Sequence, residues 1–405
     1  MKKLIHICTV TLAALSAALL GLTAGVAAGM PDTFRATAAH AISLTHPLPV
    51  TAALPAGASA RVGAVYPVEL KAFGVIPVKQ ASVQMVAKTY VVPCGTPFGI
   101  KIFTDGVMVV GLTDVDTADG AVNPARNAGV KEGDVILEIG GKVVNTNESI
   151  AAAVEASGGN PLDFSVRRGT QVFTVPVTPV ISQTDHAYKT GIWVRDSSAG
   201  IGMLTFYDPE SQTFAGLGHA VCDVDTGEQL PLMTGEICSA QITGITKGVA
   251  GSPGEVHGQF ASDMLGTLLL NSETGVYGHL TVVPLSVPKI EVAARQDVRE
   301  GSAQILTSLD GEAPKLFDCD IEKANVSDSS STQNLVVHIT DEQLLSKTGG
   351  IVQGMSGSPI LQNGKLAGAV THVFVRDPTR GYGIFAENMV LTSKALENGQ
   401  MRFAS

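Results

Sequence analysis

The chain has 405 residues, with 27 Lys and Arg against 37 Asp and Glu, and a net charge of −10 at pH 7. Charged residues make up only 16 % and hydrophobic residues 45 %, a balance that excludes a disordered protein. The acidic charge, without a basic block, excludes a nucleic-acid-binding surface, and the 44 Gly and 20 Pro favour short strands and turns over long helical bundles.

An apolar segment opens the chain. Lys2 and Lys3 precede residues 4–30, which carry no formal charge. A secretory signal has about 7–15 apolar residues and a spanning helix about 20, so length favours an uncleaved signal-anchor with its N-terminus in the cytoplasm. The small residues Ala36-Thr37-Ala38 leave a cleaved signal peptide open. Either way, we expect the segment 1–30 to direct the remainder to a membrane and outside the cytoplasm.

Residues 31–64 are rich in Ala, Pro and Thr and predict a linker, followed by an extended β segment at 65–95. Beyond Cys8 in the apolar segment, four cysteines remain, and their spacing matches no zinc site: Cys94, Cys222, Cys238 and Cys319. Disulfides and buried free thiols both stay open for them.

The stretch 96–180 alternates short strands with two helices. We expect strands at 101–104, 107–110, 162–166 and 171–177, and helices at 124–128 and, after Asn147 as N-cap, 148–156. The A-G-V-x-x-G-D-x-I pattern at 128–136 resembles a PDZ domain.

That resemblance implies a carboxylate-binding loop at Pro97-Phe98-Gly99-Ile100, whose N–H groups would receive a peptide C-terminus while the peptide adds a strand to the sheet. Pro97 departs from the Gly that many such loops carry. Asp114, Asp116 and Asp119 lack the spacing of a calcium loop, and we expect neither metal nor cofactor.

Residues 181–405 show short strand patterns punctuated by Gly, and they predict an all-β domain, most simply a pair of barrels. The expected strands are 191–194, 201–206, 276–283, 334–339 and 366–375, with a short helix at 393–398.

Gly354-Met355-Ser356-Gly357-Ser358-Pro359 is the most informative hexapeptide. A nucleophilic serine needs backbone N–H groups aimed at the developing oxyanion, and flanking glycines let the amides of Gly354 and Ser356 serve. The pattern G-x-S-G-[GS]-P resembles the nucleophile loop of chymotrypsin-like serine proteases. It differs from the G-x-S-x-G elbow of α/β-hydrolases, because Ser358 occupies the final position.

His219 is the best candidate base, because it ends a strand-like run and lies 137 residues before Ser356, a separation suited to opposite barrels. His257, His279, His338 and His372 stay open as bases. The acid between base and nucleophile stays open among Asp223, Asp225, Asp263, Asp297, Asp310, Asp318, Asp320, Asp328 and Asp341.

Together with the apolar N-terminus and the PDZ pattern, three further segments resemble the stage IV sporulation protein B family of serine peptidases over about residues 65–390. These are 218–227, the Ser356 loop and the tail 371–384. The resemblance implies a triad of His219, Asp341 and Ser356. Asp341 precedes Ser356 by only 15 residues, late for a chymotrypsin-like acid, so Asp263 is the alternative.

The resemblance also implies a role in endospore formation. The peptidase would cross the forespore inner membrane, cleave its own chain, and cleave a membrane-bound regulator to release an intramembrane protease that processes a sigma-factor precursor. Two other functions stay open: a non-catalytic PDZ scaffold with a degenerate peptidase domain, and a generic extracytoplasmic quality-control protease.

Overall fold

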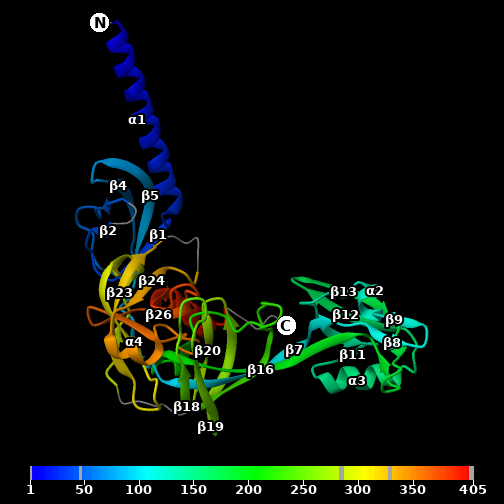
Figure 1. Ribbon diagram of the computed structural model, residues 1–405. Helices are drawn as coiled ribbons and strands as arrows, with labels where there is room; N and C mark the ends of the chain where they lie inside the picture. The colour runs from blue at the N-terminus through cyan, green and yellow to red at the C-terminus, as the bar shows by residue number, and fades with distance from the viewer. Residues whose placement is uncertain (1, 45–47, 282–286, 327–330, 401–405) are drawn as a thin grey trace.

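The computed structural model describes residues 2–44, 48–281, 287–326 and 331–400. Asp328, one of the acids left open, lies outside them. An N-terminal helix leads into a small sheet, which packs on a two-barrel body, and a smaller module is joined to that body by two long strands (Figure 1).

The apolar segment forms one long helix, and Thr9–Gly29 within it is apolar enough to span a membrane. This helix is α1, Lys2–Gly29. A five-stranded sheet in the order β1-β5-β4-β3-β2 follows. Its strands are β1 Thr33–Ala36, β2 Ile42–Leu44, β3 Val50–Ala52, β4 Val65–Ala72 and β5 Ile76–Met85. The expected linker at 31–64 is therefore wrong: its alternating buried apolar residues give it three of these strands.

Six strands close into a first barrel in the order β7-β18-β19-β20-β17-β16, because β16 also pairs with β7. They are β7 Pro97–Leu112, β16 Ile192–Asp208, β17 Thr213–Gly216, β18 Leu232–Thr246, β19 Glu255–Ser272 and β20 Gly275–Leu280. β6 Tyr90–Pro93 and β21 Ile290–Glu291 extend the sheet beside β16.

The PDZ module is an insertion in this first barrel. The long strands β7 and β16 leave the barrel side by side and continue into the module, where β7 also pairs with β10 (Figure 1). The module's other elements are β8 Val115–Thr117, β9 Gly120–Val122, α2 Pro124–Ala128, β10 Val135–Ile139, β11 Lys142–Val143, α3 Asn147–Ala156, β12 Leu162–Arg168, β13 Gln171–Val177, β14 Val180–Ile181 and β15 Tyr188–Lys189. Both expected helices and the last two expected strands are present, but Thr146, not Asn147, is the N-cap of α3.

The insertion changes the expected domain boundaries. Residues 97–104 of β7 pair with β16 and β18 of the barrel, so the peptidase unit begins before the module and resumes after it. The expected division into 96–180 and 181–405 missed this, because an inserted module leaves no compositional change inside a strand that it shares with its host.

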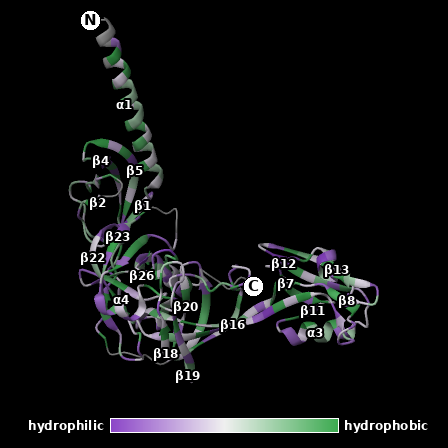
Figure 2. Cartoon of the chain, in the orientation of Figure 1, coloured by the Kyte–Doolittle hydropathy of each residue, from purple (hydrophilic) through white to green (hydrophobic). Residues whose placement is uncertain are grey.

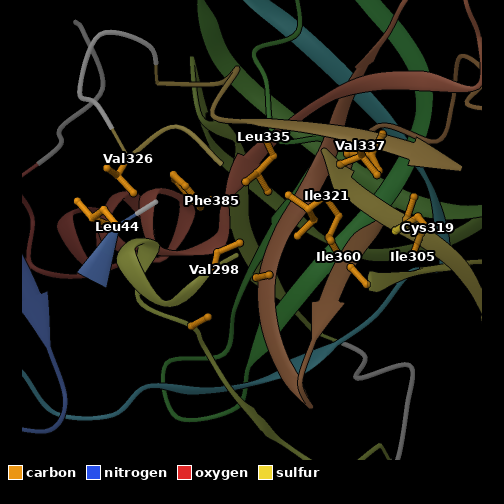
Figure 3. Close-up of a cluster of buried hydrophobic side chains, with 14 of the residues drawn as sticks. Leu44, Val298, Ile305, Cys319, Ile321, Val326, Leu335, Val337, Ile360 and Phe385 are labelled. Atoms are coloured by element: carbon orange, nitrogen blue, oxygen red, sulfur yellow. The ribbon is translucent and has the colours of Figure 1, made fainter. Parts of the chain in front are cut away.

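A second closed barrel has the order β22-β23-β24-β27-β26-β25. Its strands are β22 Gly301–Thr307, β23 Lys315–Ala324, β24 Leu335–Ile339, β25 Pro359–Gln362, β26 Lys365–Val373 and β27 Arg380–Phe385. The short helices are η1 Arg295–Asp297, α4 Glu342–Thr348 and α5 Ala386–Glu397, the last longer than the expected 393–398. Figure 3 shows the core of this barrel, with Ile305, Ile321, Val337 and Ile360 pointing inward.

The expected fold class, mainly β with an N-terminal membrane segment, a PDZ module and a double β-barrel, is confirmed. The four cysteines from Cys94 onward are free thiols. Burial raises the pKa of the Cys94 and Cys319 thiols to about 12, so both are neutral, poorly reactive parts of the core.

Candidate active site

The Ser356 loop joins α4 to β25 and lies against the first barrel. Gly354 and Gly357 have φ of +96° and +92°, a left-handed backbone that favours glycine. A Cβ at Gly357 would overlap the Met203 carbonyl oxygen and lie 2.5 Å from the Leu217 nitrogen. Met203 N–H in turn donates to the Ser356 carbonyl at 2.9 Å. The glycine therefore permits close contact between the two barrels at the serine.

Two amides of this loop are free. Met355 N–H donates to the Val352 carbonyl and Gly357 N–H to the Val370 carbonyl, at 3.1 and 2.8 Å. In the described part of the chain, the N–H groups of Gly354 and Ser356 have no protein acceptor. Both residues are half-buried at the cleft, and two free amides beside a serine are what an oxyanion hole requires.

His219 follows β17 after an unusual backbone turn. Leu217 and Gly218 both have positive φ, at +65° and +72°. For a leucine this conformation costs on the order of 1–3 kcal/mol, and the burial of its side chain in the first-barrel core offsets that cost. Such strain clusters at functional sites, and here it directs the next residue, His219, into the cleft between the barrels.

The imidazole of His219 is oriented by a backbone carbonyl. Its Nδ1 lies 2.7 Å from the Ala220 oxygen. Because a carbonyl only accepts, Nδ1 carries the hydrogen, and Nε2 keeps the lone pair that a general base needs. Burial lowers the pKa of His219 to about 4, the Ala220 hydrogen bond opposes this, and nearby His372 adds to it. The ring is therefore neutral at pH 7.

A cleft of about 640 Å³ brings the candidate residues together. His219, Gly354, Ser356 and His372 all line it. Ser356 Oγ donates to the Thr371 carbonyl at 2.7 Å, and the ring centroids of His219 and His372 are 4.7 Å apart. In this structure the Ser356 hydroxyl is therefore hydrogen-bonded to Thr371 and not to His219. It must rotate before it can transfer its proton, as is common in free enzymes.

The other histidines considered as bases lie elsewhere. His257 Nε2 is 2.6 Å from Thr246 Oγ1, His338 faces Glu322 at 3.5 Å, and His279 is exposed on β20. None of the three lines the cleft.

The structure does not bring Asp341 to His219. Asp341 is the N-cap of α4, where its carboxylate accepts from Gln343 and Leu344 N–H at 2.9 and 3.0 Å. Its second oxygen accepts from Asp318 N–H at 3.3 Å. Asp341 does not line the cleft, and its contacts are those of a helix cap.

The alternative acids do not complete a triad either. Asp263 is exposed on β19 and is absent from the cleft lining. Asp223 lines the cleft, but its carboxylate faces Arg195 at 3.0 Å and accepts from the Thr226 N–H at 2.9 Å. The Ala220 carbonyl holds the imidazole instead. No sequence motif could have indicated this, because every residue carries a backbone carbonyl.

The predicted carboxylate-binding loop is wrong. Residues 97–100 are the first four residues of β7, where Gly99 pairs with Ile201 on one side and Cys238 on the other. Both strand edges are used, so no peptide has access. Figure 1 shows instead that β16 enters the module beside α3, and the structure gives this stretch, residues 192–196, one partner strand, β7.

Two facing six-stranded barrels, with a serine loop from the second and a histidine from the first in one cleft, define a serine endopeptidase of the chymotrypsin-like class. The match of residues 186–390 to the family model described as SpoIVB peptidase S55 agrees with this class. The chain belongs to the SpoIVB peptidase S55 family.

Other similarities are partial. A putative zinc metalloprotease of Bartonella henselae is 30 % identical over 117 residues, 28 % of this chain and 32 % of the relative. Serine protease HTRA1 of Xenopus tropicalis is 41 % identical over 56 residues, 14 % of this chain and 12 % of the relative. This chain thus spans a third or less of the length of these relatives. Among its described residues, no cluster of three His, Cys, Asp or Glu side chains could hold a metal.

Solved structures are similar at low identity. The Rv3671c protease from M. tuberculosis in its active form matches at a TM-score of 0.32 and 12 % identity, covering 51 % of this chain and 78 % of that one. The PDZ domain of an SdrC-like protein from Listeria monocytogenes matches at 0.19 and 20 %, covering 23 % of this chain and 90 % of that one.

Proposed function

We propose that Ser356 is the nucleophile and His219 the general base of this peptidase. The observation that carries the proposal is the shared cleft, in which a neutral imidazole and two free amides surround one serine. His219 Nε2 takes the hydroxyl proton as Oγ attacks the peptide carbonyl. The Gly354 and Ser356 amides then stabilise the oxyanion, and the imidazolium protonates the leaving amine.

A fluorophosphonate probe tests this assignment. Purified full-length chain should be labelled at Ser356, and Ser356→Ala should lose both labelling and peptide cleavage. Ser358→Ala is the matched control, because Ser358 is in the same loop but its hydroxyl is buried against Thr307 Oγ1 at 3.1 Å. Peptide binding without any labelling would favour the non-catalytic scaffold.

The substrate proposed for this peptidase is a membrane-bound regulator, together with its own chain, in sporulation signalling outside the cytoplasm. Support comes from membership of the SpoIVB family and from the helix that could place the barrels at a membrane. In sporulating cells, Ser356→Ala should block both self-cleavage and sigma-factor precursor processing. Cleavage of many unfolded proteins at many sites by the purified enzyme would instead favour quality control.

The N-terminal segment is proposed to stay attached as an anchor at the forespore inner membrane. β1 pairs with β5 through Ala36 and Met85, and Phe34 is buried. Cleavage at Ala36-Thr37-Ala38 would remove β1 from the sheet. Mass spectrometry of the membrane fraction should therefore find β1 joined to α1.

Peptide capture is proposed at the β16 edge beside α3, in place of residues 97–100. Trp193 lies on that stretch, is 65 % exposed, and donates from Nε1 to Thr113 Oγ1 at 2.8 Å. It is the chain's one tryptophan, so its fluorescence reports this edge. Titration with C-terminal peptides of the chain's own cleavage products should shift its emission, and the Trp193→Phe variant is the control.

A further inference from the structure

The turn between β4 and β5 carries an apolar surface that the peptidase site does not use. Residues 72–78 are Ala-Phe-Gly-Val-Ile-Pro-Val, and Lys71 and Lys79 bracket them. Phe73 and Val75 at the tip of the turn are 55 % and 73 % exposed. We refer to residues 72–78 as the apolar turn.

The apolar turn leads into β5, the strand that contacts α1. β5 pairs in parallel with β1, so following β5 backward from Ser82 leads toward the helix. Lys79 Nζ donates to the Met30 carbonyl at 2.5 Å and pairs with Asp32 at 2.8 Å, which ties β5 to the helix end. Figure 2 shows the base of α1 beside β5, at the same end of the molecule as the β4–β5 hairpin.

The sheet covers one face of the candidate membrane span. Val26 and Met30 are buried in the same core as the sheet, while Thr23 and Ala27 are half-buried. These four residues have helical spacing and make one stripe. Thr23 lies six residues before Gly29, about 9 Å along the helix axis at 1.5 Å per residue.

The apolar turn therefore reaches the depth of the membrane. The 21 residues Thr9–Gly29 are about 31 Å long, close to the hydrocarbon thickness of about 30 Å, so Gly29 marks the outer boundary. Val75 precedes Lys79 by four residues, about 13 Å along the strand at 3.3 Å per residue. If β5 follows the helix axis over this length, that distance would bring Phe73 and Val75 to the level of the outer leaflet.

The backbone of the turn suits such an environment. Phe73 N–H donates to the Pro49 carbonyl at 2.8 Å, and Val75 N–H to the Ala72 carbonyl at 3.1 Å. Paired amides are what hydrocarbon demands. Lys71 Nζ pairs with Glu69 at 3.2 Å and Lys79 Nζ with Asp32 at 2.8 Å, so the charged groups at the base of the turn are neutralised by partners in the protein.

We propose that the apolar turn inserts Phe73 and Val75 into the outer leaflet of the membrane that α1 spans. Together with α1 it forms a second membrane contact, which restricts rotation of the peptidase about the helix. The occupant of this surface is lipid, because the helix that the turn follows defines where the hydrocarbon lies.

Fluorescence quenching tests the proposal on the full chain in vesicles of phosphatidylcholine and phosphatidylglycerol. Phe73→Trp is made in a Trp193→Phe background, with Val75→Trp as a second reporter in case the first disturbs the turn. Val172→Trp in the same background is the control, because Val172 is 59 % exposed on β13 of the PDZ module. Each tryptophan variant must match the circular dichroism spectrum and the melting temperature of its Trp193→Phe parent.

Both turn reporters should emit at shorter wavelength than the control, and acyl-chain-brominated lipid should quench them while aqueous acrylamide does not. Quenching by acrylamide alone would place the turn in water and overturn the proposal. Protection from both quenchers would show a protein partner or a second copy on this surface, and would overturn it equally.

Discussion

The two barrels contribute unequally to the site. The second barrel is continuous in sequence from Gly301 to Phe385, and its serine loop presents two free amides. The first barrel is interrupted by the PDZ module, and its histidine follows a strained turn at Leu217 and depends on the Ala220 carbonyl. The continuous barrel thus carries the proposed nucleophile in a loop with two free amides, whereas the interrupted barrel carries the proposed base, whose orientation depends on the neighbouring backbone.

Because of this difference, regulation by the PDZ module would act through the first barrel. β7 and β16 run without interruption from the first barrel into the PDZ module. A peptide added to the β16 edge would therefore act on the barrel that holds His219 rather than on the barrel that holds Ser356. Rotation of the Ser356 hydroxyl from Thr371 toward His219 is the step that such a change would favour.

The largest effect on kcat is expected from replacing Ser356, the proposed nucleophile on the second barrel. Ser356→Ala should lower kcat by about 10⁵- to 10⁶-fold, as loss of a serine nucleophile does elsewhere. Peptide turnover measures it, and an unchanged melting temperature shows that the fold is intact. Retained cleavage by the purified variant would remove Ser356 from the mechanism.

Contact between the barrels is tested by Gly357→Ala. The new Cβ would meet Met203 and Leu217 of the first barrel, so we expect a loss of about 2–5 kcal/mol of stability and of most activity. Gly364→Ala is the matched control, with φ of +73° and no atom within 4 Å. It should lose only about 1 kcal/mol. Equal losses in urea unfolding would contradict the close approach at Gly357.

The first barrel's base is tested by pH. Because the pKa of His219 is lowered to about 4, the neutral base should persist on acidification, and kcat/KM should fall only as pH approaches 4. His372→Ala exposes His219 to water and removes the positive charge that His372 carries when it is protonated. The pKa of His219 should therefore rise toward 6.5, and the fall of kcat/KM on acidification should move with it.

The same shift affects stability. A histidine that binds its proton more weakly when folded stabilises the fold above its unfolded pKa of about 6.5, and this contribution falls away as pH drops toward 4. If kcat/KM of the unmodified enzyme already falls as pH drops through 6.5, His219 is not desolvated.

The smallest effect is expected at Asp341. As the N-cap of α4, Asp341→Ala should lower stability by about 1 kcal/mol, with little change in kcat. Asp341→Asn keeps a capping oxygen and should restore most of that stability. A fall in kcat near 10⁴-fold in the Asn variant, as loss of a triad acid gives, would instead return Asp341 to the catalytic group.

Local patterns predicted some elements well. α2 begins at Pro124 and ends at a left-handed Gly129, as its sequence predicts, and β12 and β13 flank the turn at Gly169. The sequence also predicted that Ser356 and His219 share a site. Gly218 precedes His219, and Gly354 and Gly357 flank Ser356, and all three glycines have positive φ.

Features that depend on distant partners were not predictable. Pro97-Phe98-Gly99-Ile100 has the composition of a binding loop, but pairing with β16 and β18 makes it a strand. Asp341 lies between His219 and Ser356 in the chain, as a triad acid does, but in the folded chain its carboxylate accepts from the distant Asp318 N–H and it does not line the cleft.

The apolar N-terminal helix, the PDZ module, the β-rich peptidase unit and the candidate pair His219 and Ser356 could all be predicted from the sequence, because hydrophobic length, strand periodicity and glycine placement are local properties. Three features became visible only in the folded chain: the module is inserted into the first barrel, a backbone carbonyl holds the imidazole, and the sheet with the apolar turn packs on the apolar helix. These depend on strand pairing between residues far apart in the chain, and pairing leaves no mark on composition or spacing.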